Sequence, residues 1–138
     1  MSIKTQCDRP LPQNLEAERS VLGAILLNNQ AFQAAEAILD AGDFFREPNR
    51  HIFFAMRRLA ERKAAIDLVS LKDELSVLGY LAQAGGPAYI AALVDGVPRS
   101  TNVEHYARII KEKATLRALI HSAEIILAKA YADDALNG

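Results

Sequence analysis

The stretch NVEHYARIIKEKATLRALIHSAEIILAKAYA, residues 102–132, decides the fold of this chain. It contains no proline and no glycine, and it is rich in Ala, Leu, Ile, Lys, Arg and Glu, which favour helix. Asn102 is a suitable N-cap residue, so the pattern predicts one helix from about Asn102 to about Ala132. Such a helix is far longer than the ~11–12 residues of an average globular helix.

The apolar residues of this helix follow two lines. The first line consists of Val103, Ala107, Ile110 and Ala114, and the second of Leu116, Ile120, Ala123, Leu127 and Ala130. At ~100° per residue, the second line lies roughly 120° around the helix from the first, so one core cannot easily cover both. We expect the first half to pack on the body of the domain. The second half, which also carries Leu119, Ile125 and Ile126, would meet a following helix or another subunit. A long core helix with ordinary irregularity is the alternative.

The composition indicates a single globular domain. The chain has 138 residues, of which 51% are hydrophobic and 24% charged. A net charge of −1 gives no overall electrostatic case for nucleic acid or an acidic membrane. No apolar run approaches the roughly 18 residues of a membrane span, and the N-terminus lacks the apolar core of a signal peptide. The single cysteine, Cys7, excludes an intramolecular disulfide and fits a reducing cytoplasm.

Short helices are predicted ahead of the long one. Residues 1–12 are polar and form a flexible arm, and Asn14 then opens a helix with Glu16 and Glu18 in its first turn. The small pair Gly23 and Ala24 predicts a close helix contact. A second helix, beginning after residues 28–29, is expected to end at a Gly42 cap.

The next helices are separated by turn residues. Pro48 fits the start of the third helix, and Ser70 and Asp73 have the spacing of a capping box in the fourth. The glycines of residues 85–86 break the chain before a short helix at residues 88–94. No segment alternates at period two, so the predicted fold is all-α: a compact bundle of about five or six short helices followed by one long helix.

This pattern divides the chain into four parts: a flexible arm at 1–12, a globular helical head at 13–98, a long helix at 99–132, and the truncated start of a second helical arm or a linker at 133–138.

Catalytic and metal-binding patterns are absent from the sequence. His51, His105 and His121 have no cysteine partners, so we expect no metal site. No Gly-Lys-Ser/Thr follows the glycine pair, and no acid–base pair is identifiable, so we expect no catalytic residue. The residues alone indicate a binding or assembly module.

A basic cluster is formed by Arg57, Arg58, Arg62 and Lys63. These cations are either a DNA-binding patch or ordinary partners of a helix C-terminus; the second interpretation is favoured.

Five segments together carry a family resemblance. They are PQNLEAERSVLGAILLN at 12–28, DFFREPNRHIFFAMRRL at 43–59, IDLVSLKDEL at 66–75, LAQAGGPAYIAAL at 81–93 and NVEHYARIIKEKATLRALI at 102–120. In this order they resemble the N-terminal domain of DnaB-type replicative DNA helicases, over roughly residues 11–132. A small departure is Arg99, where relatives usually carry Thr after the proline.

The resemblance implies a helical head followed by a helical hairpin that pairs with neighbouring hairpins. In the family these domains form a collar, a trimer of dimers, on a ring hexamer, and the collar docks DnaG-type primase. The resemblance implies that the parent protein would unwind duplex DNA in the cytoplasm, with ATP and Mg²⁺ bound in a RecA-like C-terminal domain. This chain lacks that domain's phosphate loop. It is therefore expected to be an N-terminal fragment without ATPase activity, without a cofactor of its own, and in contact with DNA only through the absent domain.

The resemblance also implies site residues. The positions that face primase in relatives match Tyr89, Ile120 and Ile126. Each could instead be a core residue, and the isoleucines could serve the hairpin interface. Candidates for self-association, as a dimer of this fragment, are Leu116, Leu119, Ile120, Ala123 and Leu127. The alternative function is a stand-alone helical DNA-binding or adaptor domain.

Overall fold

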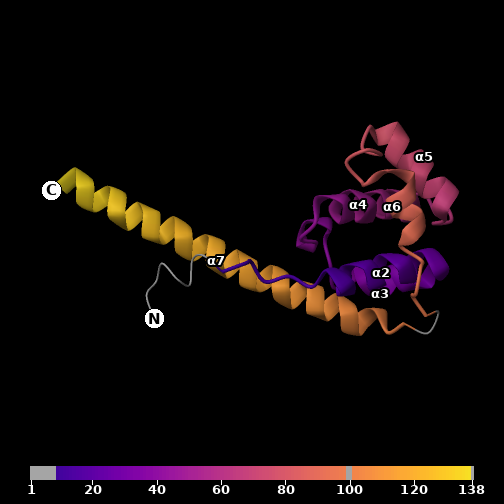
Figure 1. The fold of residues 1–138 in the computed structure, drawn as a ribbon, viewed down its shortest axis with the longest axis horizontal. Coiled ribbons are helices and arrows are strands. Elements are labelled where there is room, and N and C mark those ends of the chain that lie inside the picture. The colour runs from indigo at the N-terminus through magenta and orange to yellow at the C-terminus, as the bar shows by residue number, and fades with distance from the viewer. Residues whose placement is uncertain (1–8, 99–100, 138) are drawn as a thin grey trace.

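A head of short helices and one long projecting helix make up the part of the chain that the structure describes. The structure is a computed structural model that describes residues 9–98 and 101–137. The elements are α2 (Leu15–Leu27), α3 (Gln30–Glu36), the 3₁₀ helix η1 (Ala41–Asp43), α4 (Glu47–Glu61), α5 (Leu68–Leu78), α6 (Gly86–Ala92) and α7 (Val103–Asn137). These residues form helices and no strand, so the predicted all-α architecture is confirmed (Figure 1).

Phe53 lies at the centre of the head. It is fully buried on α4, and its ring centroid is 5.5 Å from that of Phe32 on α3 and 5.1 Å from that of Phe44, which follows η1. Ile52 and Met56 are also fully buried on the same face of α4. The spacing of these residues places one apolar stripe of an amphipathic helix against the other elements.

Gly23 allows α2 to approach the chain that follows α6. A methyl group at Gly23 would overlap the backbone oxygen of Leu93 and would lie 2.9 Å from a methyl group of Val97. Only glycine fits this contact, which confirms the close packing predicted for the Gly23–Ala24 pair.

The first half of α7 packs on the head as predicted. The side chain of Asn102 accepts a hydrogen bond from the backbone N–H of His105 at 3.2 Å, so Asn102 caps the helix. Val103, Ala107 and Ile110 are buried, and α7 contacts both α2 and α3 here.

The long helix then leaves the head and continues to Asn137 (Figure 1). The predicted end near Ala132 was therefore wrong, and so was a second arm or linker from residue 133. Residues 133–137 have the sequence DDALN, without a glycine or a proline that would end the helix earlier.

Two local predictions in the head were also wrong. Helix α3 ends at Glu36, and Gly42 lies in η1 rather than at a helix cap. The capping box of α5 joins Asp67 and Ser70, not Ser70 and Asp73. The Asp67 carboxylate accepts from Ser70 N–H at 2.8 Å, and the Ser70 hydroxyl oxygen accepts from Asp67 N–H at 3.0 Å.

Three predictions fall wholly or partly on residues outside the described ones. They concern Cys7, Arg99 and most of the arm at residues 1–12. Within 9–98 and 101–137, no helix combines the length and the apolarity that crossing a membrane requires.

Candidate docking surface

Tyr89 lies in the middle of the short helix α6, four residues after Gly85. The preceding Gly85 has a φ of 93°, a left-handed conformation that glycine adopts without strain. A methyl group at Gly85 would lie 2.7–2.8 Å from atoms of Tyr89, so the tyrosine packs directly over this glycine. The Tyr89 side chain is half-buried.

A chain of hydrogen bonds runs from Tyr89 into the core. The Tyr89 hydroxyl donates to Oδ1 of Asn49 at 2.5 Å, and Nδ2 of Asn49 donates to Oε1 of Glu18 at 2.8 Å. Glu18 is 1% exposed and Asn49 is fully buried. Oε2 of Glu18 also accepts from the backbone N–H of Phe45 at 2.8 Å, so this carboxylate ties α2 to the segment that enters α4.

Two arginines lie close to the tyrosine. The guanidinium of Arg46 is 5.7 Å from the Tyr89 ring centroid, and that of Arg19 donates to the backbone oxygen of Ala92 at 3.2 Å. Burial raises the pKa of the Tyr89 phenol, against the opposing effect of these two cations. The phenol therefore keeps the proton that it donates to Asn49.

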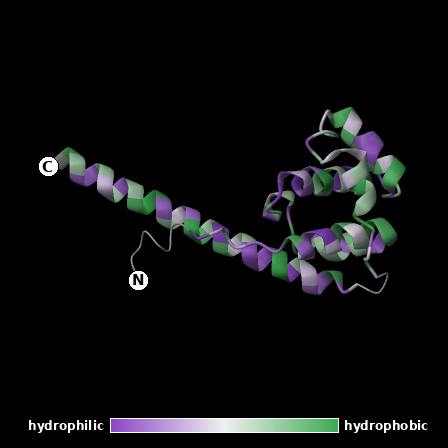
Figure 2. Ribbon diagram, viewed as in Figure 1, coloured by the Kyte–Doolittle hydropathy of each residue, from purple (hydrophilic) through white to green (hydrophobic). Residues whose placement is uncertain are grey.

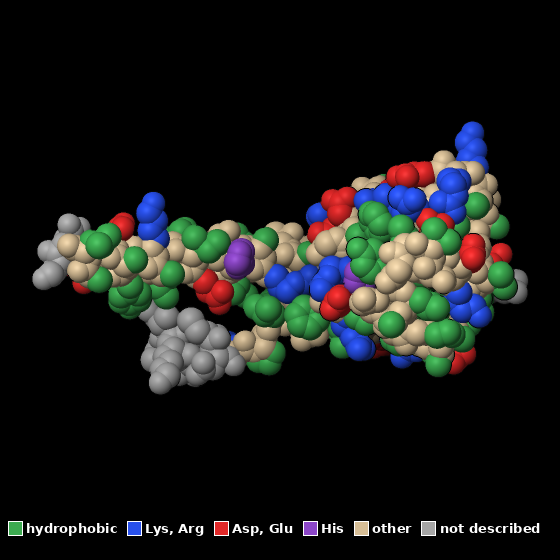
Figure 3. Space-filling model, turned by 90° about the horizontal axis from the view of Figure 1, so that it is seen from above, with side chains coloured by type: hydrophobic (Ala, Val, Ile, Leu, Met, Phe, Trp, Pro, Cys, Tyr) green, Lys and Arg blue, Asp and Glu red, His purple; other side chains and the backbone are tan. Residues whose placement is uncertain are grey.

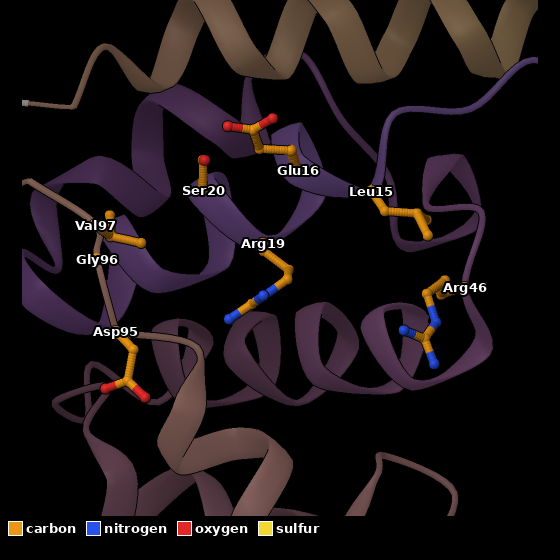
Figure 4. A pocket seen from close by; sticks show the side chains of 8 residues that line it. All are labelled: Leu15, Glu16, Arg19, Ser20, Arg46, Asp95, Gly96 and Val97. Carbon is orange, nitrogen blue, oxygen red and sulfur yellow. The ribbon is translucent and has the colours of Figure 1, made fainter.

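Arg46 and Arg19 also line a surface pocket of about 530 Å³. Its other lining residues are Leu15, Glu16, Ser20, Asp95, Gly96 and Val97, which come from α2 and from the segment after α6 (Figure 4). The pocket thus presents both signs of charge next to apolar side chains. This mixture suits the surface of another protein better than a single small anion.

The projecting part of α7 is a second candidate surface. Its exposed large apolar side chains are Leu116, Leu119, Ile125, Ile126, Leu127, Tyr131 and Leu136. Hydrophobic residues recur along α7 to its end (Figure 2), and hydrophobic side chains are visible along the projecting arm in Figure 3. Ala123 is exposed and Ile120 is half-buried. Each predicted self-association residue is therefore on this arm.

The three predicted primase-facing residues do not form one cluster within a chain. Tyr89 belongs to α6 in the head, whereas Ile120 and Ile126 belong to the projecting part of α7 (Figure 1). Ile126 is 69% exposed, so among the described residues it is not a core side chain.

The root of the arm is fastened by two cations of α7. Arg117 donates to the backbone oxygen of Pro12 at 2.8 Å and to that of Asp43 at 2.6 Å, and its guanidinium lies 5.3 Å from the Phe45 ring centroid. Lys111 forms an ion pair with Asp43 at 3.1 Å. The chain just before α2, including Pro12, therefore lies against α7.

The basic cluster of α4 is largely neutralised by neighbouring carboxylates. Arg58 and Arg62 pair with Glu74 of α5 at 2.9 and 2.6 Å. Arg57 lies 3.8 Å from Glu36 and 3.5 Å from Asp40. Blue and red side chains accordingly lie side by side on the head in Figure 3. These contacts favour the structural interpretation of the cluster over a DNA-binding patch.

No group of three or more His, Cys, Asp or Glu side chains that could hold a metal ion occurs within the described part of the chain.

Sequence reasoning missed Glu18 and Asn49 as parts of this site. Glu18 was placed in the first turn of its helix without a further role, but its side chain is buried in the core. One signal could have identified it, because Glu18 shares a helix face with the buried Leu22 and Ile25, four and seven residues later. A carboxylate on an apolar face needs hydrogen-bond donors from elsewhere. Asn49 carries no comparable local signal.

The family model described as DnaB-like helicase N terminal domain matches residues 10–112. The chain is 44% identical over 124 residues to the replicative DNA helicase DnaB of Geobacillus stearothermophilus. The matched region covers 90% of this chain and 27% of that relative. The chain therefore spans only part of the length of such relatives, from 14% to 28%.

Solved structures agree with the sequence comparison. The N-terminal domain of DnaB helicase from Mycobacterium tuberculosis superposes with a TM-score of 0.86 at 35% identity, covering 91% of this chain and 89% of that one. A DnaB-like replicative helicase, described together with its interactions with primase, gives a TM-score of 0.72 at 26% identity over 86% of this chain and 28% of that one. The head, the long helix and the matched residues together show that this chain belongs to the DnaB-like helicase N-terminal domain family.

Proposed function

We propose that this chain is the collar domain of a replicative DNA helicase, which assembles the helicase ring and docks a DnaG-type primase. The relatives are replicative helicases by name, and one solved relative is described with its primase interactions. The parent protein would be a hexamer that unwinds DNA with ATP. These 138 residues contain no Gly-Lys-Ser/Thr loop, so nucleotide binding is assigned to another part of that parent.

The projecting half of α7 carries this proposal. Leu119 is 61% exposed, Ile126 69% and Tyr131 71%, although all three lie on a well-formed helix. Burying one aliphatic side chain contributes ~1.5–3 kcal/mol, so a helix with this many exposed side chains has a strong tendency to associate. The alternative of a stand-alone DNA-binding domain, acting through the basic cluster, assigns these residues no function.

Sedimentation of the purified domain tests the assembly function. The wild-type domain is expected to form a dimer at high concentration through its α7 arms. The double substitution Ile120→Glu and Leu127→Glu places charges on the second apolar line and is expected to leave a folded monomer. Ala118→Glu with Ser122→Glu is the matched control, because these positions lie on the opposite side of the same helix.

Two sedimentation results would contradict the proposal. One is a wild-type domain that stays monomeric near millimolar concentration. The other is a control variant that loses the dimer as completely as the Ile120 and Leu127 variant.

Titration with the helicase-binding domain of the primase from the same genome tests the docking function. Tyr89→Ala removes an aromatic side chain at the proposed contact, and such anchors often contribute ~2 kcal/mol or more. We therefore expect Kd to rise by roughly 30-fold, which is that free energy expressed as an equilibrium constant. Unchanged affinity would place the docking surface elsewhere.

A further inference from the structure

The hydrogen-bond chain behind Tyr89 has a fixed direction. Glu18 accepts from Phe45 N–H at 2.8 Å, from Arg46 N–H at 3.4 Å and from Nδ2 of Asn49 at 2.8 Å. Backbone N–H groups can only donate, and an ionised carboxylate can only accept. The amide of Asn49 must therefore turn its NH₂ group toward Glu18.

This orientation decides what Asn49 offers to Tyr89. With its NH₂ group facing Glu18, Asn49 presents Oδ1 to the phenol, and the Tyr89 hydroxyl donates to that oxygen. The phenol proton is thus used in a hydrogen bond to the buried Asn49. Any partner group that reaches the phenol oxygen must be a hydrogen-bond donor.

The same chain restricts the position of the aromatic ring. The ring packs on Gly85, the guanidinium of Arg46 lies 5.7 Å from the ring centroid, and the hydroxyl is bonded to a fully buried side chain. A tyrosine on a helix of seven residues would otherwise rotate among several rotamers. Holding an interface side chain in its bound orientation raises affinity because less conformational freedom is lost on binding.

We propose that Glu18 and Asn49 are positioning residues for the partner-docking Tyr89, with Glu18 setting the Asn49 amide and Asn49 holding the phenol. This inference rests on the proposed docking function. It adds that two buried polar residues, neither of which a partner can touch, control the affinity for primase.

A double-mutant cycle on primase affinity tests the link between Asn49 and the Tyr89 hydroxyl. Tyr89→Phe removes only the hydroxyl, and Asn49→Ala removes its acceptor. Each is expected to raise Kd about fivefold, the effect of one typical hydrogen bond. If Asn49 acts through the hydroxyl, the Kd of the double variant is also raised about fivefold. If the two residues act independently, their effects multiply and Kd rises about 25-fold.

A residue that only stabilises the head must be distinguished from a positioning residue. Asn29→Ala is the matched control. Its side chain makes hydrogen bonds of 2.7 Å with both the N–H and the carbonyl oxygen of Ile66, beyond the C-terminal end of α4. This variant is expected to lower the melting temperature without changing primase affinity, measured well below every melting transition.

Exchanging the carboxylate and the amide provides a rescue. Glu18→Gln alone and Asn49→Asp alone disrupt the donor and acceptor order, so each is expected to lower affinity. When the two substitutions are combined, the amide now on α2 can donate to the carboxylate now on α4, and that carboxylate can still accept from the Tyr89 hydroxyl. The combined variant should bind primase within about twofold of the wild type, since the single hydrogen bond to the phenol is restored.

The outcomes separate this inference from the proposed function. A wild-type domain that does not bind primase overturns the docking function and the inference with it. Primase binding that Tyr89→Ala abolishes but Tyr89→Phe leaves unchanged overturns the inference alone. The inference is also overturned if the effects of Tyr89→Phe and Asn49→Ala on binding free energy are additive, or if Asn29→Ala loses as much affinity as Asn49→Ala. A combined Glu18→Gln and Asn49→Asp variant that folds but still binds primase weakly would overturn it too.

Discussion

Among single residues, Gly23 is the one whose substitution is expected to change the stability of the domain most clearly. Gly23→Ala places a methyl group against the backbone oxygen of Leu93, which cannot move without displacing the end of α6. We expect the free energy of unfolding to fall by about 1–3 kcal/mol, the usual effect of overpacking. Thermal or urea unfolding measures it. Gly42→Ala is the control, because no atom lies within 4 Å of the position that its added methyl group would take, and no such loss is expected.

Glu74 makes stability depend on pH. Hydrogen bonds first from Arg62 and then from Arg58 lower the pKa of this carboxyl from 4.5 to about 2. Because the pKa is lower in the folded state, the ionised carboxylate stabilises the fold at any pH above 4.5, the pKa of the unfolded chain. This contribution is lost as pH falls from 4.5 through about 2.

Glu74→Gln tests this contribution. The variant is expected to lose about 1–2 kcal/mol at neutral pH and to show a smaller decrease of stability than the wild type on acidification. Urea denaturation at several pH values measures both. Asp73→Asn, at the exposed neighbouring position, is the control. Equal pH profiles for the wild type and Glu74→Gln would contradict the assignment.

Among the elements, α7 has two halves that differ in their contacts with the rest of the domain. Residues 103–114 pack on the head, whereas the side chains from Leu116 onward are largely exposed, apart from Arg117, which binds Pro12 and Asp43. Helices without tertiary contacts are marginally stable in water. At low protein concentration we therefore expect amide hydrogens of residues 116–137 to exchange faster than those of residues 107–114.

Protein concentration should change this difference. Association of the arms buries their side chains, so protection of residues 116–137 is expected to rise with concentration while that of residues 107–114 stays constant. Exchange mass spectrometry at low micromolar and near-millimolar concentration measures it. High protection of the arm that does not depend on concentration would show that the arm is stable by itself.

The helices and their local caps could be predicted from the sequence better than the contacts between side chains of different helices. The cap at Asn102 and the buried line through Val103, Ala107 and Ile110 follow from local spacing, and both are confirmed. The Glu18 carboxylate, by contrast, binds an amide 31 positions away, and such a contact depends on how α2 and α4 pack. The end of α7 was also missed, because a helix without a stop signal has no local feature that fixes its length.

For the whole molecule, charge pairing determines the expected behaviour toward DNA. The net charge is −1, and Arg57, Arg58 and Arg62 face carboxylates. We expect weak or no binding of this domain to duplex DNA at physiological salt, because few cations are available to displace counterions from the phosphates. Fluorescence anisotropy with a labelled duplex measures it. A sub-micromolar complex that disappears when Arg57, Arg58, Arg62 and Lys63 are replaced would contradict this.

The fastening of α7 by Arg117 makes the arm a lever with its fulcrum at the edge of the head. From Arg117 to the end of the helix the arm is about 30 Å long, at 1.5 Å per residue. A tilt of about 10° at the fulcrum would therefore displace the tip by about 5 Å, comparable to one turn of helix. The carbonyl oxygens of Pro12 and Asp43, which receive the guanidinium, are the points at which that angle is set.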